Sequence, residues 1–367
     1  MKIKKLETFT KPFVSFVKIT DDNENFGYGQ MSTYYADITA QIFHKQVAPW
    51  VLGKSWQDFD DIGNLILERE HKFPGSYILR AIAGLDTALW DMKGRIENKA
   101  VVSLIGGSPG KLRVYGSSMK RDITPQAEAD RFKKLEDEKG INAFKFRIGT
   151  ECGRGEDEWP GRSEEIIKVI NKNLDLNTSK LVDANSCFNP SRAIELGHML
   201  EDNGVTHYEE PCPYWEPNQT LEVTNALNID VTGGEQDCYL RIWQDIIEKK
   251  IVNIVQPDVM YMGGLTRTLK VAEMAAQKNI SCTPHTANLS LVTMCTMHFL
   301  KAIPNAGKYL ELSIEGKDYY PWQQNLFLND PFLVQDGKVK ISESPGWGIE
   351  INQNWLNNAD YSVSKID

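Results

Sequence analysis

Residues 180–211, KLVDANSCFNPSRAIELGHMLEDNGVTHYEEP, contain two short β-type segments, KLVDAN and THYEEP, whose ends carry acids. These acids are Asp183 and Glu209, and a third, Glu235, ends the segment IDVTGGE at 229–235. The three positions differ by 26 residues each time, about the length that a strand, a loop, a helix and a second loop require. We therefore expect three neighbouring parallel strands that carry the three carboxylates at the same height.

The same alternation of strand and helix begins at Arg113 and continues to residue 312. Such alternation predicts parallel strands joined by helical crossovers. Eight strands with seven intervening helices would form a modified TIM barrel, (β/α)7β, in which reactive groups lie at the carboxyl ends of the strands. The expected strands are RVYGSS (113–118), AFKFRIG (143–149), KLVDAN (180–185), THYEEP (206–211), IDVTGGE (229–235), VNIVQPD (252–258), ISCTPHT (280–286) and KYLEL (308–312).

The first hundred residues have a different pattern of predicted strands and helices. Residues 1–31 read as short strands, and helical stretches follow as far as residue 95. The segment GGSPGKL at 106–112 is typical of a boundary. We therefore expect an α/β chain in three parts: an N-terminal α+β domain at 1–112, the barrel at 113–315, and a C-terminal segment at 316–367 that returns to the first domain.

The bulk composition restricts the class of protein. An apolar content of 41% and a charged content of 25% are those of a globular chain. A net charge of −9 argues against nucleic acid or an anionic membrane as a partner. No apolar run approaches the roughly 20 residues of a membrane span, and the N-terminus lacks the apolar core of a signal peptide. With six scattered cysteines and no CxxC pair, we expect reduced thiols in a cytoplasmic protein.

The three evenly spaced acids predict a metal site. Converging carboxylates repel one another unless a cation lies between them, and oxygen ligands are those that Mg²⁺ prefers. We therefore expect Asp183, Glu209 and Glu235 to bind one Mg²⁺. Glu210 is a rival ligand because it adjoins Glu209, although it should point toward the barrel wall. Asn185, two residues after Asp183, should face the same pocket and suits a substrate oxygen or a metal-bound water.

Other strand ends carry groups suited to proton transfer. His285 ends the seventh expected strand and Asp258 the sixth, so the carboxylate could orient the imidazole and raise its basicity. Lys145 and Arg147 are two residues apart on the second strand, so both should point into the barrel mouth. Glu311, on the last strand, could hydrogen-bond a developing enolate oxygen or could support another group.

Taken together, these residues resemble the enolase superfamily and, within it, the mandelate racemase subgroup, or mandelate racemase/muconate lactonizing enzyme family. The helix AIAGLDTALWDMKG at 81–94 and the tail around SPGWGIEI at 344–351 also resemble its capping domain and closing segment, so the resemblance covers nearly the whole chain. It implies that the three acids bind Mg²⁺, that Asp258 and His285 form a His–Asp dyad, and that Glu311 is an electrophilic group. The segment KFR at 145–147 matches the Lys-x-Lys pair of the subgroup.

The resemblance also implies a first chemical step and the location of substrate selection. The shared step is removal of a proton α to a carboxylate, with Mg²⁺ holding the enediolate. The capping domain chooses the substrate through loops that here lie near residues 20–35, which include Tyr28, and near 50–58.

The chain departs from this pattern at two places. Arg147 replaces the second lysine, and because an arginine keeps its proton it is a poor base. A two-base racemase is therefore disfavoured, and the base is either Lys145, with a pKa lowered by Arg147 and Mg²⁺, or His285. The segment after strand two is unusually long, and it could line the pocket with Trp159, Arg154 or Arg162, or be a solvated loop.

We therefore expect a Mg²⁺-dependent lyase that removes the α-proton of a sugar acid and eliminates the β-oxygen, giving a 2-keto-3-deoxy acid. The alternatives are a cycloisomerase that opens an anhydro-sugar acid or a lactone, an epimerase or racemase, and a non-catalytic binding protein. The expected partners are a small carboxylate substrate and, in a homo-oligomer, further copies of the chain.

Overall fold

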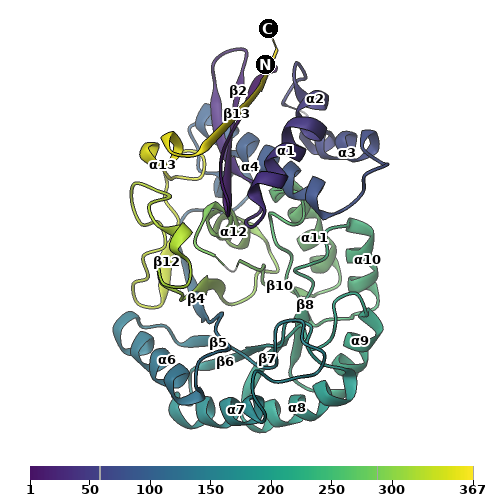
Figure 1. The fold of residues 1–367 in the computed structure, drawn as a ribbon, viewed down its shortest axis with the longest axis vertical. Coiled ribbons are helices and arrows are strands. Elements are labelled where there is room, and N and C mark those ends of the chain that lie inside the picture. The colour runs from purple at the N-terminus through teal and green to yellow at the C-terminus, as the bar shows by residue number, and fades with distance from the viewer. Residues whose placement is uncertain (58, 287, 367) are drawn as a thin grey trace.

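The computed structural model describes residues 1–57, 59–286 and 288–366. Asp58, the last residue of one expected specificity loop, lies outside the described residues. Figure 1 shows the N-terminal strands and helices at one end of the molecule and a ring of strands with outer helices at the other. The chain ends lie close together at the N-terminal end of the molecule (Figure 1).

Eight parallel strands form the barrel in sequential order, with β4 flanked by β5 and β11. Closure comes from a parallel bridge between Cys282 and Ala306, which joins β10 to the segment leading into β11. The predicted barrel is therefore confirmed. Its strands are β4 (Lys111–Ser117), β5 (Ala143–Arg147), β6 (Ser179–Asp183), β7 (Val205–Glu209), β8 (Asp230–Gly233), β9 (Ile254–Val255), β10 (Ser281–Cys282) and β11 (Leu310–Ser313).

A helix follows each of the first seven barrel strands. Local sequence sets where some of them begin: Thr124 and Asn189 cap α6 and α8 by accepting backbone N–H bonds, and each is followed by a proline at the first helical position. The helices are α6 (Pro125–Lys139), α7 (Arg162–Asn173), α8 (Pro190–Asp202), α9 (Pro217–Ala226), α10 (Leu240–Glu248), α11 (Leu265–Gln277) and α12 (Leu291–Ala302).

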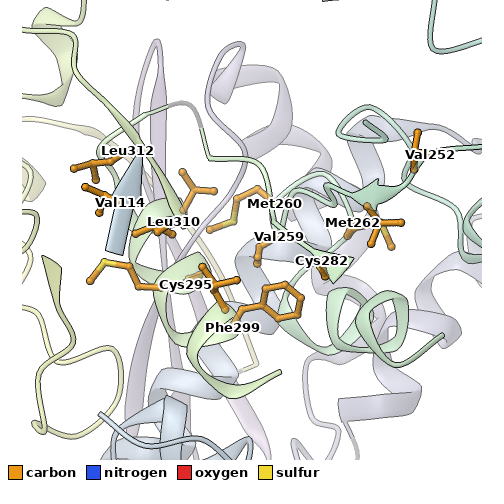
Figure 2. Close-up of a cluster of buried hydrophobic side chains, with 14 of the residues drawn as sticks. Val114, Val252, Val259, Met260, Met262, Cys282, Cys295, Phe299, Leu310 and Leu312 are labelled. Atoms are coloured by element: carbon orange, nitrogen blue, oxygen red, sulfur yellow. The ribbon is translucent and has the colours of Figure 1, made fainter. Parts of the chain in front are cut away.

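Apolar side chains bind the barrel strands to their helices. Figure 2 shows Leu310 of β11 near Val114 of β4, with Cys295 and Phe299 of α12 nearby. Cys282 of β10 is fully buried in the same cluster. Because this core is closely packed, the carboxyl ends of the strands, and the polar side chains on them, are held at fixed positions.

The N-terminal part forms a separate antiparallel sheet in the order β13-β1-β2-β3, covered by helices. The tail returns to it as expected, since β13 pairs with β1, whereas β12 pairs with the barrel strand β4. The remaining elements are β1 (Ile3–Lys11), β2 (Val14–Asp21), β3 (Phe26–Gln30), α1 (Ala36–Ile42), η1 (Phe43–Val47), α2 (Ala48–Val51), α3 (Phe59–Arg69), α4 (Ser76–Glu97), α5 (Val101–Leu104), η2 (Pro321–Gln323), β12 (Lys338–Lys340), α13 (Gln353–Asn357) and β13 (Asp360–Lys365).

Two further sequence-based expectations concern the cysteines and membrane spans. All six cysteines are free, and five of them are buried. Among the residues described, no helix combines the length and apolar character that crossing a membrane would need.

Candidate functional site

The candidate site lies at the carboxyl ends of the barrel strands, where charged side chains gather. Arg147, Asp183 and Glu209 are register partners on β5, β6 and β7, so they stand side by side at one height. All three are almost fully buried. The two acids that begin the predicted metal site are therefore neighbours, as the sequence spacing indicated.

The third acid does not stand at the expected height. The residue beside Glu209 on β8 is Thr232, so Glu235 lies three residues farther along the chain, after β8 has ended. Equal spacing failed to give equal height because Glu209 pairs with Thr232, so that β7 and β8 pair at an offset of 23 residues rather than 26, and because Gly234 turns the chain with φ of 104°. Glu235 is nevertheless buried, and its Oε2 lies 3.5 Å from Nε2 of His285.

Lys145 occupies the centre of the charged cluster. Its ammonium nitrogen lies 2.8 Å from Oε1 of Glu209, 2.8 Å from Oε1 of Glu311 and 3.5 Å from Oδ2 of Asp183. Burial and Arg147 lower the pKa of Lys145, but Glu209 and Glu311 more than offset them and hold that pKa above its usual value. The two carboxylates therefore stabilise the ammonium form of Lys145.

Arg147 is fixed by several acceptors. Its Nε donates to the carbonyl of Ser118 at 2.8 Å, and Nη1 donates both to Asp183 and, at 2.8 Å, to Oδ1 of Asn185. The guanidinium thus sits beside the first predicted metal ligand, on the same side of the mouth as Asn185. This position suits a clamp for oxygen atoms.

His285 and Asp258 form the expected pair. Nδ1 of His285 lies 2.8 Å from Oδ2 of Asp258, whose other oxygen accepts the backbone N–H groups of Met260 and Tyr261. The backbone bonds fix the carboxylate, and the carboxylate fixes the ring with Nε2 directed toward Glu235. Burial lowers the pKa of His285, but Glu235 and Asp258 outweigh it and raise the value to about 10. The imidazole can therefore carry a proton for donation.

Glu311 supports Lys145. Its Oε1 accepts a 2.8 Å bond from Ser117, and Oε2 accepts the backbone N–H of Thr286 at 2.8 Å. Burial raises the pKa of Glu311, but Lys145 and His285 lower it to well below its usual range. Of the two roles left open for Glu311, an ionised partner of Lys145 fits these contacts better than a proton donor.

Glu210 turns away from the mouth. It adopts a positive φ of 42° and lines a cleft of about 430 Å³ together with Tyr214 and Asp237. Burial raises its pKa well above the usual value, and the charges of Glu235 and Glu209 add to this effect. Its direction is the one expected from the alternation of side chains on β7.

The charges suit a divalent cation bound by oxygen. Among the described residues, no group of three or more His, Cys, Asp or Glu side chains is placed to hold a metal ion as it stands. Instead, Lys145 and Arg147 contact the carboxylates of Asp183 and Glu209. Burial raises the pKa of Glu235 and Glu209 adds to that increase, whereas His285 and Lys145 lower it. A donor set of three buried carboxylates at the carboxyl end of the barrel fits Mg²⁺.

Two predicted substrate contacts lie elsewhere. Tyr28 faces a small cleft shared with Asp91 and Arg95, so the structure does not bring it to the barrel mouth. It lies on β3 and lines this cleft with Leu291 of α12, a helix on the outside of the barrel. Trp159 packs against the guanidinium of Arg162, whose Nη1 donates to the carbonyl of Arg147 at 2.8 Å. Trp159 therefore contacts Arg162, which in turn binds the backbone of β5 at Arg147.

The structure adds residues that the sequence did not single out. Gln256 donates a 2.8 Å bond to Oε2 of Glu209, and Arg121 donates to Oδ1 of Asn185. On the other side, Arg80 of α4 stacks over the ring of Tyr261 at 3.5 Å, and that ring lies 5.9 Å from the ring of His285. Gln256 could have been found from its place in the strand segment VNIVQPD, whereas Arg80 and Arg121 carry no sequence signal.

The family comparisons follow this division of the chain. Residues 5–106 match the N-terminal domain of the mandelate racemase/muconate lactonizing enzyme family. Residues 127–355, more than half of the chain, match the enolase C-terminal domain-like family.

Two relatives with named activities are similar over most of this chain. An arabinonate dehydratase of Saccharolobus solfataricus is 25% identical over 339 residues, which cover 89% of this chain and 84% of the relative. A D-galactarolactone cycloisomerase of Agrobacterium fabrum is 28% identical over 286 residues, which cover 76% and 73%.

Solved structures give the same picture. The crystal structure of a racemase candidate from Roseobacter denitrificans is 56% identical, covers 100% of both chains and has a TM-score of 0.99. A mandelate racemase/muconate lactonizing protein of Paracoccus denitrificans, crystallised with magnesium, is 25% identical, covers 100% of this chain and 99% of its own, and has a TM-score of 0.88.

Proposed function

Because this chain belongs to the enolase superfamily, in the mandelate racemase/muconate lactonizing enzyme family, we propose that it is a magnesium-dependent lyase that dehydrates a sugar acid. The substrate is a small carboxylate, and the product is a 2-keto-3-deoxy acid. The observation that carries the proposal is a pair of proton-transfer groups, Lys145 and His285, on separate strand ends around three buried carboxylates.

Each residue has a role in this proposal. Asp183, Glu209 and Glu235 hold the Mg²⁺, which when bound polarises the substrate carboxylate and so makes its α-proton more acidic. Lys145 takes that proton as a neutral amine, because a cation held by Asp183 and Glu209 would offset the carboxylate charge that now keeps Lys145 protonated, and Arg147 clamps a substrate oxygen. His285, oriented by Asp258, gives a proton from Nε2 to the departing β-hydroxyl, which leaves as water.

A racemase is the less favoured reading, although one similar crystal structure is of a racemase candidate. Racemisation needs a base on each face of the α-carbon. Arg147, tied to Ser118 and Asp183, stands where the Lys-x-Lys pair of the family has its second lysine, and a guanidinium is a poor base. The cycloisomerase alternative uses the same elimination with a ring oxygen as the leaving group, and the cycloisomerase relative favours including lactones among the test substrates.

A substrate screen tests the proposal. Aldonates, aldarates and their lactones are incubated with the enzyme and MgCl₂, and 2-keto acid formation is followed, with exchange of the α-proton in deuterium oxide as a second readout. We expect product from at least one open-chain acid and none in excess chelator. Absence of both product and exchange across the library, or full activity in chelator, would contradict the proposal.

Metal binding is tested separately by titration calorimetry. Glu209→Gln is expected to abolish Mg²⁺ binding while the far-ultraviolet circular dichroism stays that of the wild type, because one carboxylate is lost and the barrel core is untouched. Glu222→Gln, at an exposed position on α9, is the matched control and should bind Mg²⁺ as the wild type does. Equal Mg²⁺ affinity in Glu209→Gln and wild type would remove Glu209 from the ligand set.

A further inference from the structure

Two arginines converge on a single uncharged acceptor beside the candidate site. Oδ1 of Asn185 accepts a bond from Nη1 of Arg147 at 2.8 Å and another from Nη2 of Arg121. Asn185 presents this oxygen from a left-handed backbone conformation, with φ of 41°, immediately after β6. One amide oxygen therefore orients two guanidinium groups without neutralising either charge.

Arg121 in particular has no carboxylate in direct contact, although Glu151 acts on its charge from farther away. Within the described parts of the chain, no carboxylate oxygen lies within 4.0 Å of its guanidinium nitrogens, and its Nε is buried without a hydrogen-bond partner. Burial lowers the pKa of Arg121 to about 10, and the nearby charge of Arg147 contributes to that decrease. Such a group is stabilised when an anion contacts it.

Arg121 lies at the mouth of the barrel, where a substrate would bind, rather than in the barrel core. It lies in the loop after β4, one strand away from Arg147, at the carboxyl ends of the strands. Lys145, the proposed base, is instead held between Glu209 and Glu311. Arg121 therefore lies beside Asn185 and Arg147 and outside the ion pairs that hold the proposed base.

We propose that Arg121 and Arg147 bind a second carboxylate, at the end of the substrate remote from the reacting carbon. This inference rests on the proposed function and narrows it: the substrate is a sugar diacid, an aldarate, rather than an aldonate. An aldonate ends in a neutral hydroxymethyl group, which leaves the charge of Arg121 without a close counter-ion, whereas Arg147 keeps its contact with Asp183. A carboxylate is planar and offers two acceptor oxygens, which match the fork of a guanidinium.

Binding of matched pairs of acids tests the proposal. Titration calorimetry on the Mg²⁺-loaded enzyme compares gluconate with glucarate, galactonate with galactarate, and mannonate with mannarate. We expect the wild type to bind the diacid of at least one pair about 10–100-fold more tightly, the worth of charge-assisted hydrogen bonds. Arg121→Gln should reduce that ratio to near one, and Arg121→Lys should give an intermediate ratio. Arg241→Gln, an exposed arginine on α10, is the matched control and should keep the wild-type ratio.

Three results would overturn the proposal: a wild type that prefers the monoacid in every pair, an Arg121→Gln enzyme that keeps the diacid preference, and equal weakening of both acids by Arg121→Gln. The last would make Arg121 a positioning residue for Asn185. Tighter binding of 6-phosphogluconate than of glucarate would also contradict a carboxylate subsite. Turnover of the same acids is measured in parallel, so diacid binding without turnover would contradict the proposed reaction and leave the subsite supported.

Discussion

Lys145 and Arg147 are neighbours on one face of β5, yet their partners differ in a way that separates their chemistry. Lys145 meets Glu209 and Glu311, whereas Arg147 is held by Ser118, Asp183 and Asn185. An ammonium group can release and regain a proton, but a guanidinium can only donate directed hydrogen bonds. The two residues should therefore affect different kinetic constants.

We expect Lys145→Met to slow exchange of the substrate α-proton in deuterium oxide by about 10²–10⁴-fold, the usual contribution of a general base. Arg147→Lys should mainly raise KM, because a lysine cannot reproduce the bonds to Ser118 and Asn185. Proton exchange is measured by NMR and KM by initial rates. If Lys145→Met still exchanges the proton and only a His285 variant stops it, His285 is the base.

His285 is expected to act as the acid. His285→Asn should lower kcat by about 10²–10⁴-fold while Mg²⁺ affinity stays near that of the wild type, since the imidazole is not among the proposed ligands. Asp258→Asn should be milder, because it disturbs only the orientation and the pKa of the ring. Rates of 2-keto acid formation and Mg²⁺ titrations check both variants. Dehydration at the wild-type rate by His285→Asn would refute the role.

At the residue scale, the sequence predicted which residues gather at the site better than it predicted which of them contact one another. Asp183 and Glu209 could be placed side by side because the strand pitch repeats, but Glu235 could not, because β8 pairs with β7 at a shorter offset and a glycine turn follows β8. The ion pairs of Lys145 were not predictable, since they join strands that are distant in sequence. Arg121 was missed because a single arginine in a loop has no periodicity.

At the scale of elements, the order of the strands was predictable and their lengths were not. The segments VNIVQPD and ISCTPHT each give a strand of only two residues, β9 and β10. Pro257 and Pro284 follow closely after these strands, and a proline has no N–H group for the sheet ladder. The domain limits at residues 112 and 315 remain predictions.

Helix α12 carries a buried histidine that should make stability depend on pH. Nδ1 of His298 accepts the backbone N–H of Val102 at 2.9 Å, and its ring packs edge-on against Trp347. Burial lowers the pKa of His298 to about 3, so the folded chain keeps it neutral, while the unfolded chain protonates it below about pH 6.5. The unfolded state thus binds more protons between these values, and stability is lost as the pH falls.

We expect this histidine to contribute up to about 1.4 kcal/mol per pH unit to the fall in unfolding free energy between pH 6 and the acid limit of folding. His298→Gln removes the titrating group and should flatten the dependence by that amount. His198→Gln, at an exposed position on α8, is the matched control. Urea unfolding at a series of pH values gives the slopes, and equal slopes in wild type and His298→Gln would refute the expectation.

At the scale of the whole molecule, part of the N-terminal sheet packs into the apolar core of the barrel, while Leu6, Val17 and Ile19 of the same sheet belong to a second core. The cluster that contains Val114 and Leu310 of the barrel also contains Val14 and Phe16 of β2. The C-terminal segment also connects the two parts, because it runs from the barrel back to the N-terminal sheet, where β13 pairs with β1. Apolar packing joins the two parts, and the chain passes between them twice. We therefore expect cooperative unfolding, so calorimetry should show a single transition rather than one for each part.

Asp91 connects the N-terminal part and the C-terminal segment through hydrogen bonds. One carboxylate oxygen accepts the N–H of Tyr28 on β3 at 2.8 Å and Nε of Arg95 at 2.6 Å, and the other accepts the N–H of Trp347 in the C-terminal segment at 2.9 Å. Three segments distant in sequence therefore meet at one buried side chain. Asp91→Asn keeps the shape of the side chain, but it replaces one accepting oxygen with an amide NH₂ group, which faces N–H groups and cannot accept from them.

The cost of Asp91→Asn is expected to be about 2 kcal/mol, the worth of hydrogen bonds to a charged group. For a chain of this length, that lowers the unfolding midpoint by about 2–4 °C. Asp202→Asn, at an exposed position on α8, should leave the midpoint unchanged. Differential scanning calorimetry distinguishes two outcomes. A single transition moved downward means that the N-terminal part and the barrel stay coupled through their apolar core. A split into two transitions would mean that Asp91, rather than that core, carries the coupling, and would refute the cooperative unit.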